Sequence, residues 1–158
     1  MSIEDFKGLM DGFDPASLLP ELGPVFDKFA PAARIIVLVG PAALLLMGLM
    51  YLFASPKEAN HYVGYRCYYG MGSVEAWRFT QRLAGIVWSA LGLVSGIVML
   101  VICGGFGEMQ TMDLLWKTVI CVALEAILTA VACIGVNIAV AARFDSKGNE
   151  RRKAVRRR

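Results

Sequence analysis

The sequence predicts an all-α integral membrane protein with three transmembrane helices and a short aromatic and basic motif between the first and the second. The chain is 57% hydrophobic and only 18% charged, and its charges are gathered in blocks. Residues 35–54 and 83–107 carry no charged side chain, and residues 118–142 carry one, Glu125. An apolar run of about 18 residues or more can cross the roughly 30 Å hydrocarbon core as a helix. A soluble domain would instead interleave charged and apolar residues.

Residues 1–33 form an acidic segment before the first apolar run. They contain six acidic side chains and two lysines, a net charge of −4. Phe6, Leu9, Met10 and Phe13 recur at the spacing of one helix face. We expect short amphipathic pieces lying along a membrane interface. A partly ordered tail is the alternative.

The first helix is expected to cross the membrane over about residues 35–54. It should begin near Pro31 and end before Ser55-Pro56. Pro41 lies inside it and removes one backbone hydrogen bond, which predicts a kink.

The second helix is expected to span about residues 83–103, with Ser73 as an N-cap that starts it outside the hydrocarbon. Gly92 and Gly96 form a GxxxG pattern on a face of small residues. Such a face lets another helix backbone approach closely. The expected partner is the third helix or a second copy of the chain.

The third helix is expected to span about residues 118–142, with Trp116 and Lys117 at the interface. It carries its own small-residue face, which should complement that of the second helix. That face consists of Ala126, Ala130, Cys133, Asn137 and Ala141.

Glu125 is a carboxyl group within this span, where ionisable residues are costly and face the protein or a wet cavity. We favour a carboxyl group hydrogen-bonded between the second and third helices, near Ser95 and Gly96. The alternative is a ligand or proton site that opens outward.

The distribution of basic residues predicts the orientation. Residues 143–158 have eight Lys and Arg against two acids, a net charge of +6. With three spans, this tail lies on the same side as the stretch between the first two helices, which adds four basic residues from Lys57 to Arg82. The positive-inside rule then places both in the cytoplasm and the N-terminus outside. The tail should bind anionic lipid, a simpler role beside a membrane than nucleic-acid binding.

Residues 60–82 are the only densely polar and aromatic stretch between the apolar runs. Tyr62, Tyr65, Tyr68, Tyr69 and Trp77 suit the lipid headgroup region. Arg66 could pair with Glu58 or Glu75, contact a lipid phosphate, or cap a helix. On composition alone, the stretch is a basic and aromatic anchor that fixes the depth of the second helix.

The same stretch resembles the motif of the SdpI family of small bacterial membrane proteins, named for immunity to a secreted peptide toxin. The resemblance rests on Pro56, Asn60, Gly64-Tyr65-Arg66, Ser73, Glu75, Trp77 and Gln81-Arg82. Cys67 stands where threonine is usual, and Gln81 where many members have asparagine. The resemblance implies a bacterial plasma membrane location, a possible peptide-toxin partner, and working residues at Asn60, Gly64, Tyr65, Arg66, Trp77 and Arg82.

Protection of the cell envelope against a secreted toxic peptide, without enzymatic activity, is therefore the expected function. The alternative is a structural or accessory membrane subunit acting through its small-residue faces, as a homo-oligomer or with another membrane protein. We expect no metal and no cofactor, because the four cysteines match no metal-binding spacing and His61 is the only histidine. Glu125 also lacks a second intramembrane ionisable group with which to form a catalytic pair or relay.

Overall fold

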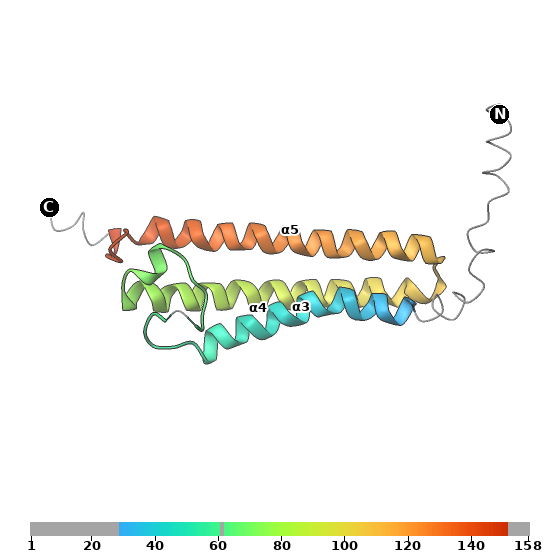
Figure 1. Cartoon of the computed structure of the whole chain (residues 1–158), viewed down its shortest axis with the longest axis horizontal. Coiled ribbons are helices and arrows are strands. Elements are labelled where there is room, and N and C mark those ends of the chain that lie inside the picture. Colours follow the sequence, from blue (N-terminus) through green and yellow to red (C-terminus); the bar gives the residue numbers. More distant parts are fainter. Residues whose placement is uncertain (1–28, 61, 152–158) are drawn as a thin grey trace, which may run out of the picture.

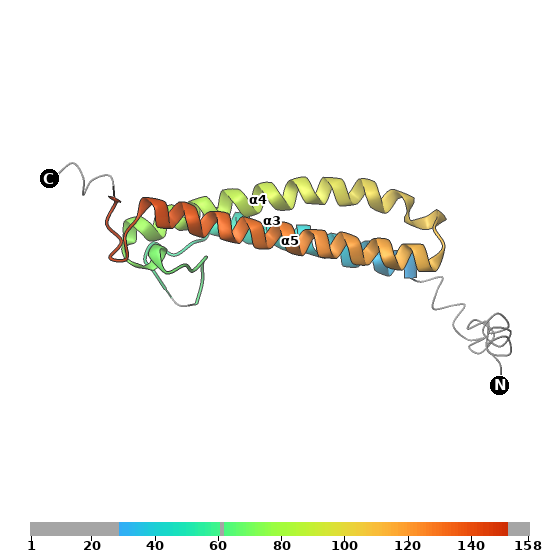
Figure 2. The same ribbon diagram turned by 90° about the horizontal axis from the view of Figure 1, so that it is seen from above.

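The computed structural model describes residues 29–60 and 62–151. It contains three long helices, α3 (Phe29–Phe53), α4 (Val74–Gly104) and α5 (Thr111–Arg143). Each is long and apolar enough to cross a membrane. The helices run alongside one another in an elongated bundle (Figure 1), and a second view shows that they do not lie in one plane (Figure 2). The predicted fold class is confirmed.

The helix ends follow from local chemistry. The Ser73 hydroxyl accepts a hydrogen bond from the Ala76 N–H at 3.1 Å, which makes Ser73 the N-cap of α4 as predicted. α3 continues through Pro41 without interruption. α5 begins at Thr111, before the Trp116 and Lys117 that were expected to mark its entry. Two short 3-10 helices, η1 (Tyr69–Met71) and η2 (Gly105–Glu108), lie in the connections.

The small-residue face of α4 packs against α3, which corrects the expectation that its partner is the third helix or a second copy. A Cβ at Gly92 would meet the backbone nitrogen of Leu45, and would lie 2.7 Å from the Pro41 carbonyl oxygen. On α3, a Cβ added at Gly48 would likewise lie only 2.9 Å from the Cα atom of Ser89 on α4. Small residues on both helices let the two backbones approach closely.

α5 contacts the other helices mainly through two clusters of buried residues, one toward each end of the bundle. Ala33, Val37, Met99, Cys103, Phe106, Leu114 and Cys121 form the cluster near η2. Ala76, Ala84, Trp88, Val136, Val140 and Phe144 form the cluster at the opposite end. We call this opposite end, which carries residues 54–73 and 144–151, the motif end.

The small residues of α5 do not complement those of α4. Ala126 and Ala130 instead line a groove between α5 and α3. Asn137 and Ala141 line a cavity beside Cys67.

The outer surface of the bundle is apolar. Ile35, Leu46, Val101 and Ile138 are each more than 60% exposed, and many other large aliphatic side chains face outward. Such a surface matches lipid tails. Residues 1–28, which make up most of the predicted acidic interfacial segment, lie outside the described residues.

Candidate functional site

The connection between α3 and α4 folds against the motif end of the bundle, on the same side as residues 144–151 (Figure 1). Within this connection, Asn60 stabilises a turn. The Asn60 Oδ1 accepts hydrogen bonds from the N–H groups of Tyr62 at 2.7 Å and Val63 at 2.8 Å. Asparagine side chains often stabilise turns in this way. The structure thus gives Asn60, a predicted site residue, a role in shaping the connection.

Gly64 follows this turn and requires the conformational freedom of glycine. Its φ is +114°, in the region that L side chains rarely adopt. A Cβ there would also lie 2.8 Å from the Trp77 ring and 2.9 Å from the Gln81 Oε1. The chain can pass so close to α4 only with glycine at this position.

Tyr65 is bound through its backbone to Gln81 of α4. Its N–H donates to the Gln81 Oε1 at 2.8 Å, and its carbonyl oxygen accepts from the Gln81 Nε2 at 2.7 Å. Gln81 is only 1% exposed, so the two bonds satisfy the polar groups of a buried amide. This pairing fixes the position of the connection over the start of α4.

The side chain of Tyr65 reaches the other two helices. Its hydroxyl lies 3.2 Å from the Cys133 carbonyl oxygen and 3.1 Å from the Asn137 Oδ1, both on α5. Its ring contacts Tyr51 of α3 and Trp88 of α4, with ring centroids 6.4 Å and 6.0 Å away. Tyr65 is thus a direct link between all three helices. Burial, reinforced by the neighbouring Cys133, raises the pKa of its phenol above the ordinary value of 10.0.

Trp77 lies inside the protein, which corrects its expected place in the lipid headgroup region. It is 0% exposed, and its indole N–H donates to the Pro56 carbonyl oxygen at 2.8 Å. Trp77 precedes Gln81 by one helical turn, so both face the connection. Tyr62 and Tyr68, in contrast, are 92% and 76% exposed.

The two arginines among the predicted site residues lie on the surface. Arg66 is exposed and close enough to Tyr51 to interact with its hydroxyl electrostatically. Arg82 is exposed next to the buried Gln81. The structure therefore brings Gly64, Tyr65 and Trp77 together with Gln81, and places Arg66 and Arg82 at the edge of this group.

Residues 144–150 form a turn that is fastened to the start of α4, an arrangement that the sequence analysis missed. The Ser73 hydroxyl donates to the Gly148 carbonyl oxygen at 2.8 Å. Phe144 and Glu150 pair through an isolated antiparallel bridge. The Asp145 carboxylate accepts from the Asn149 and Lys147 N–H groups, which holds its pKa below the usual range.

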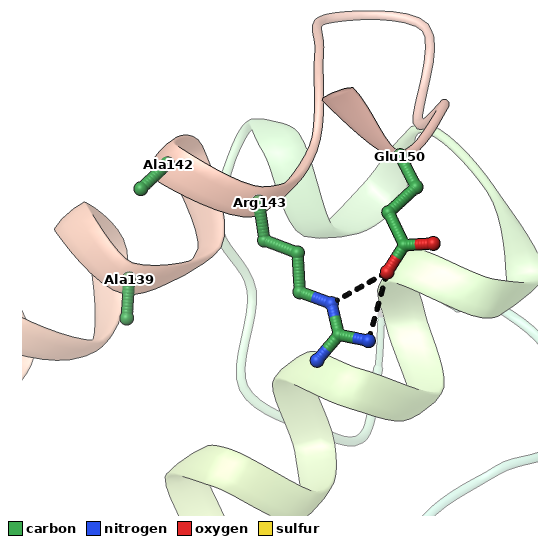
Figure 3. A pocket seen from close by; sticks show the side chains of 4 residues that line it. All are labelled: Ala139, Ala142, Arg143 and Glu150. Atoms are coloured by element: carbon green, nitrogen blue, oxygen red, sulfur yellow. Dashed lines mark hydrogen bonds and ion pairs between the residues drawn. The ribbon is translucent and has the colours of Figure 1, made fainter. Parts of the chain in front are cut away.

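Arg143 fastens the same turn from the end of α5. Its Nε and Nη2 lie 2.9 Å and 2.8 Å from the Glu150 Oε1 (Figure 3). Its guanidinium also lies 4.4 Å from the centre of the Phe79 ring on α4. Part of the basic tail is thus folded structure, whereas residues 152–158 lie outside the described residues.

Glu125 faces α3, which corrects the expectation of a carboxyl group hydrogen-bonded near Ser95 and Gly96 of α4. Its Oε2 lies against Gly40, so closely that a Cβ on that glycine would collide with it. The Ser95 hydroxyl donates instead to the Leu91 carbonyl oxygen at 2.6 Å, within its own helix. Gly96 faces Pro41 of α3, 3.6 Å from an added Cβ.

The contacts at the motif end hold a connecting segment in one position against three helices. Their chemistry is hydrogen bonding by amide, hydroxyl and indole groups together with aromatic packing. Among the described residues, no group of three or more His, Cys, Asp or Glu side chains is placed to hold a metal ion. The contacts at the motif end thus fasten the connection to α3, α4 and α5.

Comparison with known proteins identifies a family. The model of the SdpI/YfhL protein family matches residues 57–138, more than half of the chain. The chain belongs to this family. The matched region runs from the connection through the Asn137 that Tyr65 contacts. No match was found among curated proteins or among solved structures.

Proposed function

We propose that this protein protects the cell envelope against a secreted toxic peptide, as a membrane protein without enzymatic activity. The observation that carries the proposal is the linkage made by Tyr65. One residue of the motif is bonded to α4 through its backbone and to α5 through its hydroxyl. The linkage lies within residues 57–138, the region that the SdpI/YfhL family model matches. Membership of the SdpI/YfhL family supports the same function.

The proposed location is the bacterial plasma membrane, with the motif end in the cytoplasm. Residues 54–73 and 144–151 lie together at the motif end, so their basic side chains are on the same side of the membrane. The positive-inside rule places that side in the cytoplasm. The basic residues that follow would then bind anionic lipid of the inner leaflet.

The test is deletion of the gene in the native host, followed by challenge with peptides secreted by that host and its neighbours. Deletion should increase sensitivity to at least one peptide, and the wild-type gene should restore resistance. A Gln81→Met variant should restore less resistance, because it breaks the bonds to Tyr65. Gly104→Ala is the matched control, since an added Cβ at Gly104 meets nothing within 4 Å.

Protein amounts in the membrane are measured alongside survival. A deletion strain as resistant as its parent to every peptide tested would contradict the proposal. If the Gln81→Met variant and the wild type restore the same resistance at equal protein amounts in the membrane, the hydrogen bonds between Gln81 and Tyr65 are not needed for protection.

An accessory-subunit function is the second candidate, and one observation favours it. The small residues Ala126 and Ala130 of α5 do not pack against α4 and leave a groove open between α5 and α3. A helix of another membrane protein could approach α5 there. Copurification of a stoichiometric membrane partner, together with unchanged toxin sensitivity on deletion, would support this candidate over the first.

A further inference from the structure

Asn137 of α5 carries a hydrogen-bond donor that has no partner in the described part of the chain. Its Oδ1 accepts from the Tyr65 hydroxyl at 3.1 Å. Its Nδ2 makes no hydrogen bond to any residue that the structure describes. The side chain is exposed, so a molecule outside the protein can reach this nitrogen. Because an amide nitrogen only donates, the partner that it can bind is an acceptor.

The depth of Asn137 in the membrane indicates which acceptors surround it. α5 ends at Arg143, whose guanidinium is ion-paired with Glu150. Charged groups are costly within the hydrocarbon, so this pair lies at the level of the lipid headgroups. Asn137 precedes Arg143 by six residues, which places it about 9 Å deeper at 1.5 Å per residue. The interfacial layer on each side of the bilayer is about 5–8 Å thick. Asn137 therefore lies near the boundary where ester groups join lipid headgroups to their acyl chains.

The amide lines a cavity of about 340 Å³ between the α3–α4 connection and α5. The rings of Tyr68 and Tyr69, which pack edge to face with centroids 5.2 Å apart, form one wall. Ile138 and Ala141 of α5 form another. Binding sites for small molecules commonly have volumes of about 300–1,000 Å³. The cavity is thus large enough for the glycerol ester region of a lipid, though not for a whole lipid.

An exposed apolar stripe on α5 continues from the cavity toward the middle of the membrane. Ile138 lines the cavity, and Ile134 and Val131 lie four and seven residues before it. Residues at these spacings share one face of a helix. All three side chains are more than half exposed. An acyl chain that leaves the cavity can therefore lie along this stripe.

We propose that the cavity binds an ester-linked glycerophospholipid, with an ester carbonyl oxygen accepting from the Asn137 Nδ2 and an acyl chain lying along the stripe. The lipid supplies a free acceptor at the depth where the protein has a free donor. A transmembrane helix of another protein fits less well, because its backbone carbonyl groups are already bonded within the helix. The proposal concerns a bound lipid and does not rest on the proposed protective function.

Binding can be measured by native mass spectrometry of the purified full-length protein in detergent. The probes are dioleoylphosphatidylcholine and its dioleyl diether analogue, which share the headgroup and the chain length. Only the first has carbonyl oxygens. Wild type should bind the ester lipid about fivefold more tightly, the equivalent of one hydrogen bond of about 1 kcal/mol. The ratio of the two affinities is taken within one protein, so differences in stability between variants cancel.

Three variants separate the donor from the cavity. Asn137→Leu keeps a side chain of similar size without the donor, so the ratio of affinities should fall to about one. Thr129→Val is the matched control, because it removes a polar group of α5 that lines the groove toward α3 instead, and its ratio should equal that of wild type. Ala141→Leu keeps the amide and fills the cavity, so it should weaken the binding of both lipids.

The proposal is wrong if wild type binds the ester and ether lipids equally, as a protein merely surrounded by lipid would. A preference for the ester lipid that persists in Asn137→Leu would also refute it. If Ala141→Leu binds both lipids as tightly as wild type does, the lipid lies elsewhere and the proposal fails.

Discussion

The side-chain amide of Gln81 forms two hydrogen bonds with the backbone of a single residue, Tyr65. It accepts from the Tyr65 N–H at 2.8 Å and donates to the Tyr65 carbonyl oxygen at 2.7 Å. A connecting segment has no neighbouring strand to pair with, and the amide of Gln81 provides the donor and acceptor that a strand would offer. The motif is therefore anchored through its backbone as well as through its side chains.

Replacement of Gln81 by methionine should destabilise the bundle. Methionine has a similar length but leaves the N–H and the carbonyl group of Tyr65 without partners. Each unsatisfied buried group costs about 1–3 kcal/mol, so we expect a loss of about 2–4 kcal/mol in the free energy of unfolding. SDS-induced unfolding in mixed micelles measures this change. Gln110→Met, at an exposed position, should change it by less than about 0.5 kcal/mol.

The Tyr65 hydroxyl should couple energetically to Asn137. Tyr65→Phe removes the hydrogen bonds of the hydroxyl to α5 and keeps the ring contacts, which predicts a loss of about 1 kcal/mol. If the bond to Asn137 contributes, Asn137→Ala should have a smaller effect when combined with Tyr65→Phe than in wild type. A double-mutant cycle measures the difference. Strict additivity of the two substitutions would show that the 3.1 Å contact adds nothing.

The contribution of Tyr65 should also depend on pH at the alkaline end. Its pKa is raised above the ordinary 10.0 in the folded protein, so the stability that depends on its protonated form is fully present below about pH 10 and is lost as pH rises further. The difference in unfolding free energy between wild type and Tyr65→Phe should therefore shrink as the pH rises above about 10. Comparing the two proteins at each pH cancels the other titrating groups. A constant difference would contradict this prediction.

The two glycines of the GxxxG pattern should differ sharply in their tolerance of alanine. At Gly92 a Cβ would collide with the backbone of α3, whereas at Gly96 it would make an ordinary contact of 3.6 Å with Pro41. Gly92→Ala should therefore lower the unfolding free energy by about 1–3 kcal/mol through overpacking, and Gly96→Ala should be close to neutral. Equal effects would mean that α4 does not pack against α3 along this face.

The orientation can be checked by cysteine labelling of intact cells, in a background lacking the native cysteines. Gln110→Cys is exposed in the η2–α5 connection, and Ser146→Cys is exposed at the motif end. A membrane-impermeant maleimide should label Gln110→Cys before lysis and Ser146→Cys only afterwards. Labelling of Ser146→Cys in intact cells would place the motif end outside.

Much of the fold follows from the sequence because long uncharged segments have few alternatives to membrane helices. The N-cap at Ser73 was also predictable, because one hydroxyl before an apolar helix has a clear local role. Which helices pack against each other was not predictable from the sequence. The helices are apolar on all sides, so no polar face marks the outside, and small residues on α4 could face any neighbour.

The site was predicted in part. Asn60, Gly64, Tyr65 and Trp77 lie at or beside the motif end, but the burial of Trp77 was missed because an aromatic residue beside basic residues also suits a membrane interface. Gln81 was not among the predicted site residues. The available signal was its position one helical turn after Trp77, which places both residues on the same face of α4. That face becomes a binding face for Tyr65 only when the connection folds back on α4.

The hydrogen bond between Ser73 and Gly148 joins residues 75 positions apart in the chain. Ser73 leaves the ribosome before α5 has been synthesised. The Ser73 hydroxyl can therefore bond to Ala76 early, but to Gly148 only at the end of membrane insertion. In a chain whose last helix failed to cross, residue 148 would remain on the opposite side of the bilayer and the bond could not form. The contact thus distinguishes a completely inserted molecule from one that has stalled in biogenesis.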